Sequence, residues 1–323
     1  MKKLLTLMLS LSVILCLGAC TAKTAECPEC PECKECETCE TTTEATVELV
    51  ETTVPSTARE GVNIPTYITL PANFDASATY PFVVMIHGHH GNHNEWGGYD
   101  TISNGLAGKG IIVATLDFSG CGASTEGIEE NCLTNFKTDV MDVINYVKDQ
   151  YKISKVGGFG YSMGGRIILE MLNEDVFVFD AIEFVAPAES TEDLMKFFGG
   201  AENWAEMSKS AKETGEMASY MSVFGEQLLS DKFFTDMEKY MDSDKLAESA
   251  SKKFTGPSLC IYATNDDVVY PEVSQRVAEA FGSEVVTVSE EGHSYSFYGA
   301  NPVVITTVNN ASIEFFAGAL AEH

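Results

Sequence analysis

Basic residues are scarce in this sequence. Its 323 residues include 20 lysines and arginines against 48 aspartates and glutamates, which gives a formal net charge of −28. A surface this acidic repels phosphate groups, which argues against nucleic acids and anionic lipid headgroups as partners. Neutral or cationic small molecules are the substrates that this charge favours.

Long apolar runs are also scarce, and only residues 4–17 form one. This run follows Lys2 and Lys3 and leads into Gly18-Ala19-Cys20. It is shorter than a typical membrane-spanning helix. Small residues directly before a cysteine are typical of a bacterial lipobox. We therefore predict a lipoprotein signal peptide over residues 1–19, acylation of Cys20, and an exported protein whose only membrane contact is this lipid anchor. An ordinary signal peptide cut after Ala19 is the alternative, and it also implies export.

Residues 20–44 are rich in threonine and glutamate and lack apolar periodicity, which predicts a tether. Inside it, cysteine recurs at every third position from Cys27 to Cys39. In a polyproline II conformation, with three residues per turn, these thiols would line one edge. A metal or iron–sulfur site, disulfides within or between chains, and a plain spacer are all compatible with this repeat.

Strand-like and helix-like patterns alternate over residues 45–323, which predicts one folded domain. Residues 46–50 and 66–70 alternate like the strands of a hairpin, and six further apolar segments read as strands: 82–86, 111–116, 155–159, 181–185, 258–263 and 284–288. Helical spacing or helix-start signals mark segments 135–151, 163–172, 271–281 and 302–320. This order predicts an α/β fold with a mostly parallel central sheet flanked by helices on both faces.

Residues 188–254 interrupt this alternation. They contain no strand-like run and are rich in methionine and aromatic residues, which predicts a helical cap inserted between two strands. Large apolar side chains are usually buried, so most of these should form the core of the cap. The remainder could line a pocket for an apolar or aromatic group.

The strongest local motif is Gly160-Tyr161-Ser162-Met163-Gly164, between a predicted strand and a predicted helix. A nucleophilic serine on a sharp strand-to-helix turn needs glycine on either side, because the two backbones crowd there. Ser162 is therefore the predicted nucleophile.

A serine hydroxyl needs a general base, and the base needs a carboxylate that fixes its tautomer. His293 follows the last predicted strand, and Asp266 follows the strand at 258–263. We predict His293 as the base and Asp266 as its partner, with the adjacent Asp267 as the reserve. A helix-capping role for this aspartate pair is the alternative.

The oxyanion of the transition state needs preorganised donors. The backbone N–H of Met163, directly after the nucleophile, is one candidate. The backbone N–H of His89 is the other, in the glycine-containing loop that follows the strand at 82–86. Histidines cluster in this loop, but no aspartate or cysteine stands among them, so a backbone-donor loop is favoured over a metal site. We predict neither a metal nor a cofactor.

Three stretches carry a resemblance to a known family: the loop that begins His87-Gly88-His89, the turn at 117–124, and Gly160–Gly165. With them, the sequence resembles the α/β-hydrolases, and within them the bacterial cinnamoyl or feruloyl esterases. The resemblance covers residues 45–323 and implies the α/β-hydrolase fold, in which the triad follows the chain order serine, aspartate, histidine. The cap lies where that family carries its small lid.

These observations favour a serine carboxylic-ester hydrolase that forms an acyl-enzyme, acting on short or aromatic esters of the cinnamoyl or feruloyl type. Hydrolysis of an acyl-peptide amide and a non-catalytic surface binding lipoprotein are the alternatives. Within the domain, Cys121 and Cys132 form a possible disulfide pair, and Cys260 lies in a strand pattern typical of a buried free thiol.

Overall fold

A computed structural model of the chain describes residues 47–241, 244–299 and 301–321. The predicted signal peptide, the acylation site Cys20 and the tether with its cysteine repeat lie outside these residues. No helix in the described part of the chain is both long and apolar enough to span a membrane.

The described residues form an eight-stranded sheet in the order β1-β2-β4-β3-β5-β6-β9-β10. From β4 to β10 neighbouring strands run parallel, whereas β2 pairs antiparallel with both β1 and β4. The predicted hairpin and the mostly parallel sheet are thus confirmed. The strands are β1 (Glu48–Pro55), β2 (Asn63–Leu70), β3 (Tyr80–Ile86), β4 (Ile112–Leu116), β5 (Ile153–Tyr161), β6 (Ala181–Val185), β9 (Ser258–Ala263) and β10 (Glu284–Val288).

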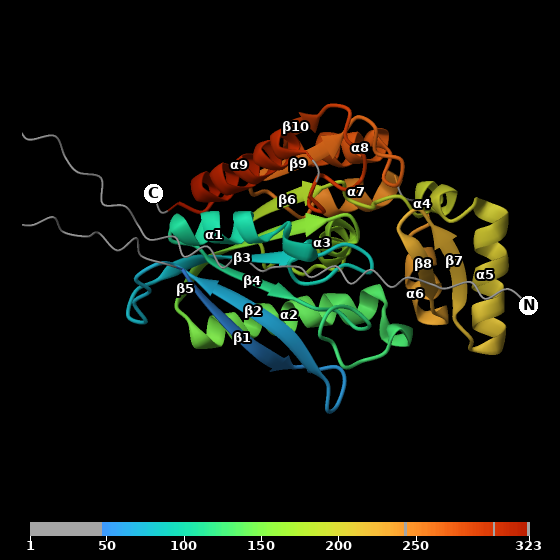
Figure 1. Cartoon of the computed structure of the whole chain (residues 1–323), viewed down its shortest axis with the longest axis horizontal. Helices are drawn as coiled ribbons and strands as arrows, with labels where there is room; N and C mark the ends of the chain where they lie inside the picture. The colour runs from blue at the N-terminus through green and yellow to red at the C-terminus, as the bar shows by residue number, and fades with distance from the viewer. Residues whose placement is uncertain (1–46, 242–243, 300, 322–323) are drawn as a thin grey trace, which may run out of the picture. The chain divides into compact units, whose positions relative to one another are not determined.

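Helices cover both faces of this sheet, which explains why its central strands are continuous apolar runs. α1 and α9 pack against each other, while α2, α3, α7 and α8 form a second row of mutually packed helices (Figure 1). These helices are α1 (Asp100–Gly108), α2 (Leu133–Gln150), α3 (Met163–Asn173), α7 (Asp244–Ser251), α8 (Pro271–Phe281) and α9 (Pro302–Ala319). Two short 3₁₀ turns, Glu95–Gly97 and Ile128–Glu130, lie in loops after β3 and β4.

The predicted cap projects from one end of the sheet, but it is not purely helical (Figure 1). It contains α4 (Thr191–Phe197), α5 (Ala201–Thr214) and α6 (Asp231–Glu238), and also an antiparallel hairpin of β7 (Ala218–Ser222) and β8 (Gly225–Leu229). The expectation of helices alone was therefore wrong. The hairpin turn is made possible by Gly225, whose φ of 98° is unfavourable for residues with a side chain.

The last helix of the predicted cap segment, α7, packs against α3 and α8 of the main domain. Leu246, Ala247 and Ala250 are buried on its inner face. The projecting part of the insertion thus ends with α6, before residue 254.

The three cysteines of the domain are separate buried thiols. Cys121 and Cys132 are not bonded to each other, so the structure does not contain the possible disulfide. Burial raises the pKa of Cys121 to about 12 and that of Cys132 to about 11, which keeps both protonated and poorly reactive. Cys260 on β9 is the predicted buried free thiol.

Candidate active site

Ser162 occupies a sharp turn between β5 and α3, with φ 52° and ψ −113°. The turn brings backbones so close that a Cβ on Gly160 would lie 2.6 Å from the Gly164 carbonyl carbon. A Cβ on Gly164 would lie 2.2 Å from the Ile86 carbonyl oxygen. Both glycines of the motif are therefore required by packing, and the unusual conformation of Ser162 is imposed by its surroundings.

The structure brings the three predicted triad residues into one hydrogen-bonded chain. His293 Nε2 lies 2.9 Å from Ser162 Oγ, and His293 Nδ1 lies 2.8 Å from Asp266 Oδ2. All three side chains are buried. With Nδ1–H donated to the carboxylate, Nε2 carries the lone pair that can accept the serine proton.

Asp266, and not the reserve Asp267, is the carboxylate that reaches His293. Its Oδ1 accepts the backbone N–H groups of Val268 and Val269, and its Oδ2 accepts the Tyr295 hydroxyl. These bonds fix the orientation of the carboxylate. Asp267 is exposed and borders a different surface hollow. The capping alternative is wrong, because Tyr270 is the N-cap of α8 and no side chain caps that helix. The two N–H groups that Asp266 accepts belong to its own turn.

The two predicted oxyanion donors lie in the same pocket as Ser162. Met163 is the first residue of α3, so its N–H has no partner within the helix. The carbonyl of Gly88 accepts the N–H of Gly91 at 3.1 Å and His87 Nδ1 at 2.7 Å. The His89 N–H belongs to the same trans peptide unit as that carbonyl, so it points the opposite way from those two donors.

His87 holds this loop in place through hydrogen bonds of both its ring nitrogens. Its Nε2 accepts the Phe118 N–H, which leaves the proton on Nδ1 for the Gly88 carbonyl. Burial lowers the pKa of His87 to about 4, so the ring is neutral as this pattern requires. Nearby, His93 Nδ1 lies 3.1 Å from Asp117 Oδ1. Among the described residues, no group of three or more histidine, cysteine or acidic side chains is arranged to hold a metal ion.

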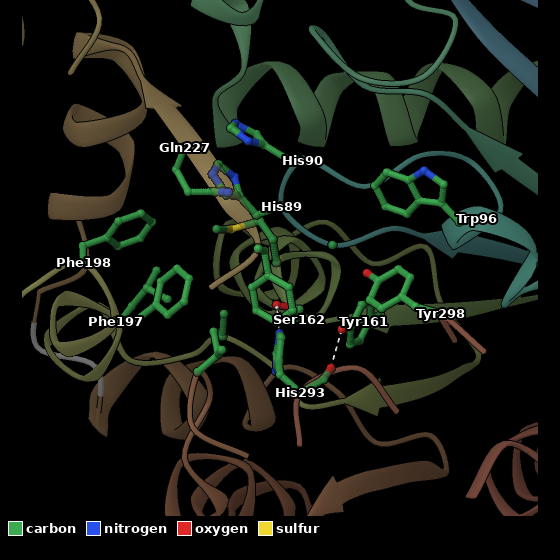
Figure 2. Close-up of a pocket in the computed structure, with 16 residues that line it drawn as sticks. His89, His90, Trp96, Tyr161, Ser162, Phe197, Phe198, Gln227, His293 and Tyr298 are labelled. Carbon is green, nitrogen blue, oxygen red and sulfur yellow. Dashed lines mark hydrogen bonds between the residues drawn. The ribbon is translucent and has the colours of Figure 1, made fainter. Parts of the chain in front are cut away.

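The pocket around Ser162 has a volume of about 290 Å³ and is mainly apolar and aromatic. Phe197 and Phe198 of the cap lie on one side of Ser162, and Trp96 and Tyr298 lie on the other (Figure 2). Phe224, at the tip of the cap hairpin, has its ring centroid 6.3 Å from that of His293. No carboxylate side chain is among the described residues that line this pocket.

A small polar group lies at the cap side of the same pocket, next to Ser162 (Figure 2). His89 stacks on His90 with centroids 4.0 Å apart, and Gln227 from β8 completes the group. Within the described structure, both ring nitrogens of His89 and Nε2 of His90 are buried without a hydrogen-bond partner. Burial lowers the pKa of both rings, so they are neutral groups able to donate or accept a hydrogen bond.

Several residues of the site were not predicted from the sequence, notably Glu95, Tyr298 and Gln227. Glu95 is one of 48 acidic residues, and only its position shortly after residues 87–92, the predicted oxyanion loop, sets it apart. Gln227 was missed together with the cap hairpin that carries it.

Comparison with solved structures supports the same fold. Est1E from Butyrivibrio proteoclasticus aligns with a TM-score of 0.64 and 18% identity over 84% of this chain and 99% of its own. A structure of Est1E with bound ferulic acid aligns equally well. The Paleococcus ferrophilus monoacylglycerol lipase aligns with a TM-score of 0.63 and 16% identity over 79% of this chain and 99% of its own.

The acylaminoacyl peptidase of Pyrococcus horikoshii aligns with a TM-score of 0.58 and 15% identity. The alignment covers 86% of this chain but only 42% of the peptidase chain. At such identities these likenesses establish the fold alone. No curated protein sequence matches this chain.

A family model described as serine aminopeptidase, S33 (Hydrolase_4) matches residues 81–294, which include the turn of Ser162, Asp266 and His293. The match spans more than half of the chain, and the sheet order and helix layers are those of the α/β-hydrolase fold. The chain therefore belongs to this α/β-hydrolase family.

Proposed function

We propose that this protein is a serine carboxylic-ester hydrolase with Ser162, His293 and Asp266 as its catalytic triad. The observation that carries the proposal is the hydrogen-bonded chain from Ser162 Oγ through His293 to Asp266, at the floor of an apolar pocket. This arrangement supplies a nucleophile, a base and an orienting carboxylate without any cofactor.

In the proposed reaction, Ser162 Oγ attacks the ester carbonyl carbon while His293 Nε2 takes the serine proton. The N–H groups of His89 and Met163 stabilise the negative oxygen of the tetrahedral intermediate. His293 then gives the proton to the leaving alcohol as the C–O bond breaks, which leaves an acyl-serine. Water, deprotonated by the same histidine, attacks this ester and releases the carboxylic acid and free Ser162.

For the acyl group, we propose a flat aromatic acid with a polar substituent, as in hydroxycinnamate esters. Phe197, Phe198 and Phe224 offer aromatic contacts on the cap side of Ser162. Three polar side chains, His89, His90 and Gln227, line the pocket, and they match an acyl group with a hydroxyl substituent better than a wholly apolar one. Est1E, of similar fold, binds ferulic acid, which supports this substrate class.

Aminopeptidase activity, one form of amide hydrolysis, is poorly supported by the pocket. An aminopeptidase must bind a cationic N-terminus, yet the described lining of the pocket contains no carboxylate. A long acyl chain, as in a lipase, would bring no polar group to His89, His90 and Gln227 in the pocket.

An ester panel tests the substrate class. We expect kcat/KM for methyl ferulate and methyl p-coumarate to exceed that for methyl cinnamate by roughly tenfold, the value of about one hydrogen bond. The kcat/KM for these two hydroxycinnamate esters should also exceed the kcat/KM for a long-chain p-nitrophenyl ester and for an aminoacyl anilide. Ser162→Ala is the control for contaminating activity. A preference for the long-chain ester would point to a lipase, and a preference for the anilide to a peptidase.

We further propose that the protein is exported and held at the membrane by a lipid on Cys20. This proposal rests on the sequence of residues 1–20.

A further inference from the structure

Glu95 is a fully buried carboxyl group shortly after the oxyanion loop. Its Oε1 accepts the backbone N–H of Gly88 at 2.6 Å, and its Oε2 accepts the Tyr298 hydroxyl at 2.7 Å. Glu95 and the next residue, Trp96, both have positive φ, 45° and 52°. Such conformations cost free energy and persist where the surroundings impose them.

The two partners of Glu95 come from different loops of the site. Gly88 lies between His87 and His89 in the oxyanion loop, whereas Tyr298 lies five residues after the base His293. Glu95 thus connects the loop that carries an oxyanion donor with the loop that carries the base.

Successive peptide units of the oxyanion loop are fixed by this arrangement. The unit between His87 and Gly88 is held by its N–H on Glu95, and the next unit is held by its carbonyl on Gly91 and His87. The second unit carries the N–H of His89. Without Glu95, the first unit would lose its anchor and the second could rotate about the Gly88 backbone, where no side chain restricts φ.

The packing leaves little freedom for another arrangement. A Cβ on Gly91 would lie 2.4 Å from Glu95 Oε1, so the carboxylate sits directly against that glycine. Neither the triad nor the acyl pocket requires this carboxylate, because Glu95 neither touches Ser162 nor lines the pocket.

We propose that Glu95 is a positioning residue that aims the His89 N–H at the oxyanion by holding Gly88 and Tyr298 together. The proposal rests on the proposed ester hydrolysis at Ser162. Since donors aimed at the developing charge act in the transition state, loss of Glu95 should lower kcat and leave substrate binding largely intact.

The carboxyl group serves this role whether or not it carries a proton. Burial raises the pKa of Glu95 to about 7, against the hydrogen bonds from Gly88 and Tyr298 and the attraction of His293. When protonated, Oε1 still accepts the Gly88 N–H and the second oxygen donates to Tyr298. Glutamine reproduces this pattern, with its amide oxygen toward Gly88 and its NH₂ toward Tyr298.

Three variants test the proposal on the full chain. Glu95→Leu should lower kcat for the best ester of the panel by roughly 10- to 100-fold with little change in KM. Glu95→Gln should recover most of that loss. Tyr298→Phe, which keeps the Gly88 bond, should lower kcat only a few-fold, as expected for one neutral hydrogen bond.

A transition-state analogue distinguishes a misoriented His89 N–H from general damage to the active site. A trifluoromethyl ketone forms a tetrahedral oxyanion on the serine, so its affinity for Glu95→Leu should fall by the same factor as kcat. The affinity for the product acid, which has no such oxyanion, should change little. Equal losses for analogue and product, or full activity of a folded Glu95→Leu protein, would overturn the proposal.

Glu183→Leu is the matched control. Glu183 is also a fully buried glutamate, but it lies on β6, bonds to Ser312 of α9 and does not line the pocket. It should keep the wild-type kcat. If Glu95→Leu does not fold, Glu95→Gln and Tyr298→Phe still decide the matter, since a large kcat loss in the glutamine variant contradicts the proposal. An inactive wild type would instead count against the proposed function.

Discussion

Ser162 shows how a single residue can depend on its neighbours' lack of side chains. Its positive φ exposes Oγ to His293 only because Gly160 and Gly164 let β5, α3 and the end of β3 approach one another. An alanine at position 164 would collide with the Ile86 carbonyl, so we expect that this substitution would disrupt the turn.

Substitutions in the triad give the first prediction. Ser162→Ala and His293→Ala should each lower kcat by roughly 10³-fold or more while the melting temperature stays close to that of the wild type. Asp266→Asn should also be severe, because the amide cannot hold the required tautomer of His293. Asp267→Asn is the matched control, since that side chain is exposed and should matter little. If steady-state kinetics show a severe loss of kcat in Asp267→Asn and little loss in Asp266→Asn, the acid of the triad is assigned wrongly.

At this scale, the sequence predicts the parts of the site that depend on chain order and turn chemistry. Ser162 and His293 follow from their places after strands. The choice between Asp266 and Asp267 is made by the structure, where the N–H groups of Val268 and Val269 orient one carboxylate inward. Glu95 was not foreseen, because its partners are a backbone N–H and a tyrosine about 200 residues away in sequence.

The cap hairpin is the element that sequence periodicity failed to predict. Met217, Tyr220, Met221 and Phe224 have a spacing that also fits a helix. In the structure these residues are partly or largely exposed, unlike the buried aromatic core formed by Trp204, Phe233 and Phe234. Burial therefore imposed no hydrophobic period on this segment, whereas the central strands of the main sheet are buried on both faces and their apolar runs located them.

The tip of this hairpin gives a prediction about substrate selection. Phe224 is 52% exposed and still lines the pocket near His293, so it can close over an aromatic acyl group. Phe224→Ala should lower kcat/KM for methyl p-coumarate by about fivefold, the value of one aromatic contact, and should lower that for an acetyl ester less. Val223→Ala, next to it but outside the lining of this pocket, is the control. Equal losses on both esters would mean that the hairpin does not select the acyl group.

The contact between β6 and α9 gives a prediction about stability. Burial raises the pKa of Glu183 to about 8, although the Ser312 hydroxyl acts in the opposite direction. In the unfolded chain, Glu183 releases its proton near the ordinary glutamate pKa of about 4.3. In the folded state it keeps this proton up to pH about 8. Glu183 should therefore make the protein less stable as the pH rises through this window, with no further change above it.

Glu183→Gln removes this titration. Urea unfolding at pH about 5 and about 9 should show a smaller loss of stability with rising pH in the variant than in the wild type. An identical pH dependence in the two proteins would show that Glu183 does not titrate in this way.

At the scale of the whole molecule, the net charge and the proposed lipid anchor bear on where the protein would meet its substrate. With a net charge of −28, the protein is expected to favour neutral esters over anionic ones. We predict that the mature protein partitions into the detergent phase of Triton X-114 with a lipid on Cys20. Cys20→Ser should abolish this partitioning or block processing. Recovery of the unmutated protein from the aqueous phase would reject the lipid anchor and leave the proposed ester hydrolysis untouched.

The central claim is that Ser162 is an activated nucleophile, and covalent labelling tests it most directly. A fluorophosphonate probe reacts with serine only where a base and an oxyanion site assist. The wild-type protein should be labelled, and mass spectrometry of its peptides should locate the adduct on Ser162. The folded Ser162→Ala variant should not be labelled. A folded wild-type protein that stays unlabelled, or an adduct that persists in Ser162→Ala, would contradict the account and favour a non-catalytic binding protein.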